Sequence, residues 1–260
     1  MDKAESINLK MTNHDSAGGT PGNPQPPTAP SRHDVHKMFD RIASRYDLLN
    51  HLLSANIDKH WRQRVAQLLP DGDNLSVLDL ACGTGDQLIT LHETGRVGQG
   101  IGIDLAEKML DVGRKKISRL KLNSSLSLQT GDAGKIPFGN DLYDTVTISF
   151  GIRNMTDVNQ TLCEMYRVLK PGGRALILEF SLPANELLRN GYLFYLRHLL
   201  PKLGALISGD NAAYRYLNET IETFPHGSAF CALMTNAGFK AVSQTTLSTG
   251  IASIYQGDKK

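Results

Sequence analysis

The sequence predicts an α/β fold: a doubly wound, mostly parallel seven-stranded sheet with a terminal antiparallel hairpin. Short β-like runs alternate with helical stretches along the chain, and this alternation is typical of βαβ units in a parallel sheet. The first β-like run leads directly into a Gly-x-Gly turn and a helix, as in folds that bind a ligand at the end of a buried strand. The chain closes on two strand-like runs, which we expect to form the hairpin.

The first five expected strands are recognised by different patterns. Ser76–Leu80 is a short apolar run that ends at glycines, and Gly100–Asp104 is a second that ends on an acid. Leu126–Thr130 alternates with the period of two that a half-exposed strand shows. Thr145–Ser149 and Arg174–Phe180 are rich in β-branched or aliphatic residues, which favours buried strands.

Helical stretches fill the intervals between these strands. The clearest are Ala106–Leu120 and Val158–Leu169. We expect Pro171–Gly173 to stop the second helix, because proline lacks an N–H and obstructs the preceding turn. The final two strands are expected at Phe239–Thr245 and Ile251–Gly257.

Composition excludes several classes of protein. Of 260 residues, 40% are hydrophobic and 21% are charged, which argues against a disordered, collagenous or membrane-spanning chain. Lys plus Arg is 28 against 26 for Asp plus Glu, so the charge argues against a nucleic-acid partner. The three cysteines have no metal-ligand spacing. We therefore expect neither a metal site nor a disulfide framework. We also expect a cytoplasmic location, which would be the inner face of the membrane if the protein binds a membrane.

The chain divides into two parts of different character. Residues 1–34 are expected to be a disordered Pro/Gly-rich tail, because Ser16–Ser31 holds five of the eleven prolines and little to bury. The tail has neither the apolar core of a secretory signal nor the Arg-rich character of a mitochondrial presequence. Residues 35–260 are expected to form one domain with N-terminal helices and a helical lid near 184–225.

The longest apolar passage, Tyr192–Ile207, leaves two interpretations open. It is too short to span a bilayer, and Arg197, Pro201 and Lys202 interrupt it. One interpretation is a helix that covers the core and is broken at Pro201. The other is an amphipathic lid that shields an apolar substrate or touches a membrane surface.

The glycine loop points to a nucleoside ligand. In Val77–Asp86 a buried run leads into Gly83-Thr84-Gly85, where backbone can approach a ligand closely. Leu88 stands where a dinucleotide fingerprint has its third glycine, which argues against an NAD-dependent dehydrogenase. Asp104, at the end of the second strand, can accept hydrogen bonds from ribose hydroxyls. A carboxylate placed to bind a ribose, in a loop that lacks the third glycine, favours a nucleoside without phosphates. S-adenosylmethionine fits this description.

Two later loops should reach the same edge of the sheet. Asp132 follows the third strand and could accept a hydrogen bond from an adenine amino group, although it could equally cap a turn. The loop Ser149–Asn154 follows the fourth strand, and we expect it to place polar groups beside the sulfonium end of S-adenosylmethionine.

The chain resembles class I methyltransferases, and more narrowly the ubiquinone/menaquinone biosynthesis C-methyltransferase family. The glycine loop and Lys170–Gly173 occur across the superfamily, while the narrower similarity lies in Met38–Asn50, Ser149–Asn154, Tyr214–Leu217 and Phe224-Pro225. The segment Ser54–Trp61 differs from the Ser-Phe-Gly form usual in the family, which could alter the substrate mouth.

The resemblance implies methyl transfer from S-adenosylmethionine to a ring carbon of a polyprenylated quinol. It implies that the cofactor is contacted by Thr84, Asp104, Asp132, Ala133 and Ser149, to which we add Gly83 and Gly85 of the glycine loop. The expected acceptor is demethylmenaquinol. The benzoquinol precursor of ubiquinone, or both acceptors, remain open, as do contact with the membrane surface and a homodimer.

The chemistry needs a group that favours the phenolate form of the acceptor. Our first candidate is Arg153, which would stabilise the oxyanion because arginine stays protonated; Asn154 and Tyr46 could hold a water or the ring hydroxyl. A structural salt bridge of Arg153 and a packed Tyr46 remain the alternatives. Other functions on this fold, an RNA or protein methyltransferase or a non-catalytic cofactor-binding scaffold, fit the loop residues less well.

Overall fold

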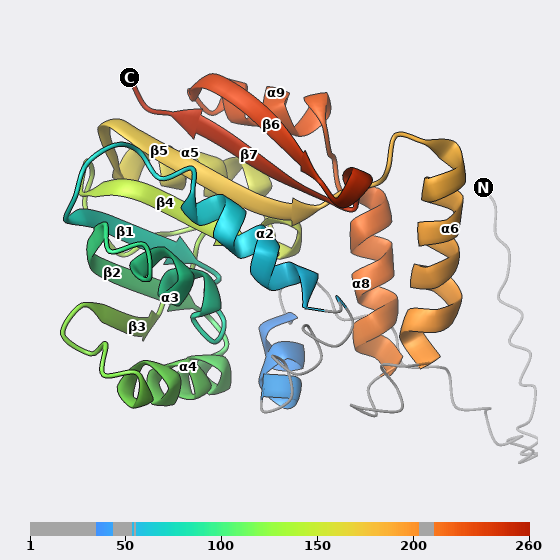
Figure 1. Ribbon diagram of the computed structural model, residues 1–260, viewed down its shortest axis with the longest axis horizontal. Helices are drawn as coiled ribbons and strands as arrows, with labels where there is room; N and C mark the ends of the chain where they lie inside the picture. Colours follow the sequence, from blue (N-terminus) through green and yellow to red (C-terminus); the bar gives the residue numbers. More distant parts are fainter. Residues whose placement is uncertain (1–34, 44–53, 55, 203–210) are drawn as a thin grey trace, which may run out of the picture.

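The computed structural model describes residues 35–43, 54, 56–202 and 211–260 (Figure 1). Its seven-stranded sheet has the order β3-β2-β1-β4-β5-β7-β6. Strands β1 to β5 are parallel, and β7 runs antiparallel to both β5 and β6. This topology confirms the predicted sheet with its terminal hairpin. The strands are β1 (Leu75–Leu80), β2 (Val97–Asp104), β3 (Leu126–Thr130), β4 (Tyr143–Ser149), β5 (Leu169–Phe180), β6 (Lys240–Leu247) and β7 (Ala252–Asp258).

Helices cover both faces of the sheet and extend beyond the carboxyl ends of its parallel strands, where α6 and α8 stand side by side (Figure 1). A helix at 35–43 lies near the same edge. The labelled helices are α2 (Ile57–Ala66), α3 (Asp86–His92), α4 (Glu107–Arg119), α5 (Val158–Val168), α6 (Glu186–Phe194), α8 (Asn211–Thr223) and α9 (Ser228–Asn236), with 3-10 turns η1 (Ile152–Asn154) and η3 (Ser248–Gly250) and a π-helical turn η2 (Tyr195–Leu199).

The buried strands supply two separate cores, because alternate residues of a strand point to opposite faces. On β5, Leu176 and Leu178 join the core under α2, α3 and α4, whereas Ala175 and Ile177 join the core under α5 and α9. Such a strand is apolar on both sides, which explains why it reads as a continuous apolar run in the sequence.

The helix stop expected from Pro171–Gly173 agrees with the end of α5 to within one residue. Helix α5 already ends at Val168, and the proline and glycines lie in the irregular start of β5. Proline is tolerated there because an irregular segment needs no complete ladder of N–H donors. Gly172 donates its N–H to the carbonyl of Lys259 (2.8 Å), and Lys259 donates to Gly173 (2.9 Å).

The expected break at Pro201 is wrong, because the helical run continues through Lys202. The irregularity lies one turn earlier, in η2, where Leu200 donates its N–H to the carbonyl of Tyr195. A wider turn of this kind is common in helices near functional sites. Leu196 and Leu200 of this run are buried against Ile221 of α8.

Candidate active site

The glycine loop joins β1 to α3 at the carboxyl edge of the sheet. Gly83 and Gly85 have φ angles of 54° and 81°, a left-handed conformation that only glycine adopts readily. A Cβ at Gly83 would lie 3.2 Å from Met109. Gly83 therefore presents backbone without a side chain to the cavity that it lines.

Asp104, at the end of β2, ties this loop to the next one. Its Oδ2 accepts a hydrogen bond from the Gly83 N–H and its Oδ1 accepts one from the Ala106 N–H, both at 2.8 Å. Burial raises the pKa of Asp104 above its usual range, although the two backbone donors act against this. The carboxylate is thus fixed at the cavity wall and still has lone pairs available for ribose hydroxyls.

Beside these groups lies a cavity of about 330 Å³. It brings together five predicted cofactor residues from four strand ends: Gly83, Asp104, Asp132, Ala133 and Ser149. Among the described residues, neither Lys nor Arg lines it. Three carboxylates (Asp104, Asp132 and Asp157), apolar neighbours such as Met109, and no Lys or Arg for a phosphate fit a nucleoside better than a nucleotide.

Two predicted cofactor residues do not line this cavity. Thr84 is buried and accepts a hydrogen bond from Lys116 Nζ at 3.1 Å, and Gly85 packs against Leu128. Asp132 lines this cavity and also holds a turn, because its Oδ1 accepts a hydrogen bond from the Gly134 N–H at 2.8 Å.

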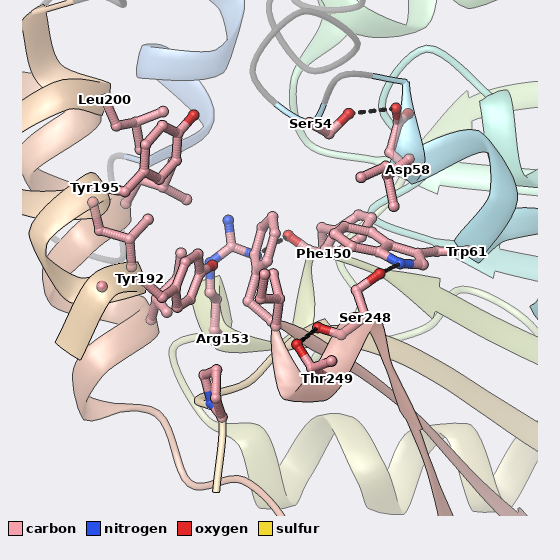
Figure 2. A pocket seen from close by; sticks show the side chains of 18 of the residues that line it. Ser54, Asp58, Trp61, Phe150, Arg153, Tyr192, Tyr195, Leu200, Ser248 and Thr249 are labelled. Atoms are coloured by element: carbon pink, nitrogen blue, oxygen red, sulfur yellow. Dashed lines mark hydrogen bonds between the residues drawn. The ribbon is translucent and has the colours of Figure 1, made fainter. Parts of the chain in front are cut away.

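A second, larger cavity of about 770 Å³ adjoins the first. Its wall is mostly apolar and aromatic and comes from segments far apart in the chain, as Figure 2 shows for Trp61, Phe150, Tyr192 and Leu200. Trp61 of α2 donates its indole N–H to Ser248 Oγ of η3 at 2.9 Å. The cavity has the size and character of a site for a bulky apolar ligand.

Phe150 forms part of the wall of both cavities. Its φ angle is 59°, a conformation that costs a bulky residue of order 1–3 kcal/mol and that is found mainly at functional sites. The Phe150 carbonyl accepts from Arg153 at 2.6 Å, and its ring lies 4.5 Å from the ring of Phe180. The junction of the two cavities is therefore rigidly held.

Arg153 lies on the wall of the larger cavity, in η1 just after β4. Its Nη1 donates to Glu179 Oε1 at 2.7 Å, and Glu179 has no solvent exposure. Its Nε has no hydrogen-bond partner among the described residues. In Figure 2 the Tyr192 ring is turned toward the guanidinium, and burial raises the pKa of Tyr192, so its hydroxyl is protonated at neutral pH. The structure thus shows the salt bridge of Arg153 and its position on the cavity together.

Asn154 follows Arg153 in η1, and both side chains approach the Phe150 carbonyl. Asn154 lines the smaller cavity, where its Nδ2 lies 3.5 Å from the Phe150 carbonyl. Tyr46 lies outside the described residues. Sequence reasoning missed Asp58, Trp61 and Glu179; the one usable signal was Glu179, a single acid within the apolar run Arg174–Phe180.

Asp79, on β1 beneath the glycine loop, is a buried carboxyl group that the site does not use. Thr147 Oγ1 donates to its Oδ1 at 2.6 Å, and Oδ2 has no hydrogen-bond partner among the described residues. Burial raises the pKa of Asp79 from 3.8 to about 7. The folded protein therefore holds this proton more tightly than the unfolded chain does, and ionisation of Asp79 opposes folding as pH rises from about 4 to about 7.

We expect Asp79→Asn to gain stability relative to the wild type as pH rises, by a few kcal/mol between pH 4 and pH 8. The amide keeps an acceptor for Thr147 but cannot ionise. Urea denaturation at both pH values measures this difference. Asp111→Asn, at an exposed position on α4, should show no such trend, and an equal effect of Asp79→Asn at both pH values would contradict the expectation.

Comparison with known proteins supports the geometry. The family model described as "ubiE/COQ5 methyltransferase family" matches residues 28–259. The chain is 41% identical over 228 residues to the ubiquinone/menaquinone biosynthesis C-methyltransferase UbiE of Geotalea daltonii, covering 86% of this chain and 96% of that protein. It is 43% identical over 222 residues to the demethylmenaquinone methyltransferase of Thermus thermophilus, covering 85% of this chain and 100% of that protein.

Solved structures bear on the fold alone. A SAM-dependent methyltransferase from Thermotoga maritima superposes with a TM-score of 0.60 at 19% identity, covering 86% of this chain and 99% of that one. At this identity the similarity establishes the architecture, which is the class I methyltransferase fold.

Proposed function

This chain belongs to the ubiE/COQ5 methyltransferase family, and from that premise we propose that it methylates a ring carbon of a polyprenylated quinol. Demethylmenaquinol is the first acceptor, and the benzoquinol precursor of ubiquinone is the second, because the relatives carry both names. The observation that supports this most is the pair of adjoining cavities. One has the carboxylates for a nucleoside, and the other is large and mostly apolar, with Arg62 and Arg153 at the junction formed by Phe150.

Bound S-adenosylmethionine supplies a methyl group on a sulfonium, which is already a strong electrophile. The main task of the protein is therefore alignment. Asp104 and Asp132 would hold the nucleoside, while Phe150 would set where the acceptor ring meets the methyl. Arg153 would stabilise the phenolate oxygen next to the attacking carbon. The hydroxyl proton of the acceptor would leave to solvent, and the methyl carbon–sulfur bond would break as the carbon–carbon bond forms. The ring carbon would then lose its proton, and the phenol oxygen would take one up, so that the products are a methylated quinol and S-adenosylhomocysteine.

The direct test supplies labelled S-adenosylmethionine with each reduced acceptor, and mass spectrometry locates the methyl group in the product. We expect transfer to a ring carbon of demethylmenaquinol, the expected first acceptor. Transfer to neither quinol, under conditions in which S-adenosylmethionine binds, would refute the proposal.

We further propose that the enzyme is cytoplasmic and takes its acceptor at the inner face of the membrane. Leu187 and Leu188 line the larger cavity and are exposed at 82% and 48%. Phe194, on the same helical run, is exposed at 58%. The mouth of the cavity is thus continuous with exposed apolar side chains, which is what a lipid-borne substrate requires. Among the described residues, no helix combines the length and apolarity needed to cross a bilayer.

The double variant Leu187→Asp/Phe194→Asp should lower the fraction of protein that sediments with phosphatidylglycerol-containing vesicles by about tenfold or more, because each apolar side chain buried in lipid contributes about 1.5–3 kcal/mol. Leu120→Asp is the matched control, since Leu120 is exposed at 45% but follows α4. Equal losses in both variants would argue against a docking surface on α6.

A further inference from the structure

The guanidinium of Arg153 is held by the protein on all but one of its groups. Nη1 donates to the Phe150 carbonyl at 2.6 Å and to Glu179 Oε1 at 2.7 Å. The central carbon lies over the Phe180 ring, 5.2 Å from the ring centre, and Nε is buried. Nη2 donates to none of the residues that the structure describes. Because Arg153 lines the larger cavity, Nη2 is the group left to meet an acceptor oxygen there.

The charge of Arg153 is balanced by that of Glu179. Glu179 has no solvent exposure, and its carboxylate also accepts the backbone N–H groups of Phe180 at 2.8 Å and of Arg153 at 3.3 Å. It is therefore a fixed anion beside the guanidinium. A phenolate formed in the cavity would meet an attractive charge that is paired with a repulsive one. A second hydrogen-bond donor without a counter-ion would stabilise the phenolate oxygen further.

Tyr192 of α6 is placed to be this donor. It lines the same cavity, and Figure 2 shows its ring turned toward the Arg153 guanidinium. Burial raises the pKa of its hydroxyl most, while the charges of Arg153 and Glu179 act on that pKa in opposite directions. The hydroxyl thus lies near the ion pair and is protonated at neutral pH. In the described ranges of the chain it forms no hydrogen bond, so its proton is available to a ligand.

We propose that Tyr192 is a further catalytic residue, which donates a hydrogen bond to the same acceptor oxygen that Arg153 meets. This inference rests on the proposed function. The oxygen becomes charged when the hydroxyl proton of the acceptor leaves to solvent, and the two donors then stabilise it as a phenolate. Tyr192 keeps its own proton throughout, so the balance of the reaction is unchanged.

Packing fixes the Tyr192 ring before a ligand arrives. The ring packs against the buried cluster of Leu196, Leu200 and Ile221, which joins the helical run after α6 to α8. A donor held in advance needs no reorganisation as charge develops, and this makes its hydrogen bond effective in a transition state. A tyrosine that only packed here would need its ring but not its hydroxyl. Removal of the hydroxyl alone therefore separates the two roles.

The pKa of a bound phenol reports this donor without turnover. We choose 4-nitro-1-naphthol as the probe, because its phenol and phenolate forms absorb differently, and titrate it on the protein with S-adenosylhomocysteine present. Tyr192→Phe should raise the pKa of the bound probe by about one unit relative to the wild type, since the phenolate loses one hydrogen bond. Circular dichroism reports whether the variant is folded, and Tyr192→Leu, which also lacks the hydroxyl, is the second replacement.

Tyr143→Phe is the matched control for this titration. Burial raises the pKa of Tyr143 from 10.0 to about 12, yet Tyr143 lines neither cavity. Its replacement should leave the pKa of the bound probe unchanged. The same unchanged pKa in a folded Tyr192 variant would show that Tyr192 only packs, and would overturn the proposal.

Turnover should change in the same direction as the titration. We expect Tyr192→Phe to lower kcat by about tenfold while the KM for the quinol stays within about threefold, because the hydrogen bond strengthens as the oxygen becomes charged. A change in KM with kcat unaffected would contradict a role in the reaction itself.

The two proposals fail in different ways. A wild-type protein that binds S-adenosylmethionine but methylates no quinol refutes the proposed function, whereas the titration of the bound naphthol needs no methyl transfer. A protein that methylates quinols, while its folded Tyr192 variants leave the pKa of the bound naphthol unchanged, refutes this inference alone.

Discussion

Arg153→Gln is expected to lower kcat by about 10²–10³-fold while S-adenosylmethionine affinity stays within about threefold of the wild type. The guanidinium lies on the wall of the acceptor cavity and makes none of the contacts that hold Asp104 or the glycine loop. Its loss should therefore act mainly on stabilisation of the phenolate; its one contact with the wall of the smaller cavity given above is the hydrogen bond to the Phe150 carbonyl, to which the glutamine amide can still donate. Single-turnover kinetics and calorimetry measure the two quantities separately.

The salt bridge complicates this variant, because Glu179 is left buried without its partner, at a cost of about 3–5 kcal/mol. The double variant Arg153→Gln/Glu179→Gln removes both charges and should recover much of the stability but none of the turnover. Arg174→Gln provides a matched control. Arg174 forms a salt bridge with Asp258 (Nε to Oδ1, 2.7 Å), and neither residue lines the larger cavity. Recovery of turnover in the double variant would show that Arg153 is purely structural.

Asp104→Ala is expected to weaken S-adenosylmethionine binding by about 100-fold or more. Each carboxylate oxygen holds one backbone N–H, and hydrogen bonds to a charged group contribute about 1.5–3 kcal/mol each. The variant loses the geometry of the glycine loop together with the group that would meet the ribose. Isothermal titration calorimetry gives the affinity directly.

Asp132→Ala is the comparison within the same cavity. Its carboxylate holds only the local turn at Gly134, so we expect a loss of about tenfold or less from a single contact. Equal losses in the two variants would mean that Asp104 has no special role in the loop. Wild-type affinity in Asp104→Ala would place the nucleoside elsewhere.

The sheet and the cofactor cavity could be predicted because their signals are local. Gly83 lies in the loop that follows β1, Asp104 ends β2, and parallel strands bring such loops to one edge. The helix stop expected from Pro171 agrees with the end of α5, but the pairing of this segment with Lys259 is a tertiary contact that no local pattern indicates.

The acceptor cavity could not be predicted in the same way. Its wall joins α2, β5, α6, α8 and η3, and the hydrogen bond between Trp61 and Ser248 spans 187 positions. No spacing rule connects residues so far apart. The sequence places Arg153 in the loop after β4, but only the packing shows that Glu179 holds it.

Phe150 makes the two halves of the site thermodynamically dependent on each other. One ring and its strained backbone form part of the wall of both cavities, so a shift of Phe150 that accommodates a ligand in one cavity would also change the other cavity. Linkage then requires reciprocity: whatever factor the quinol contributes to the affinity for S-adenosylmethionine, S-adenosylmethionine contributes equally to the affinity for the quinol. The same coupling applies to S-adenosylhomocysteine, the product of the cofactor. The wall that Phe150 forms between the cavities would therefore link methyl transfer to the release of both products.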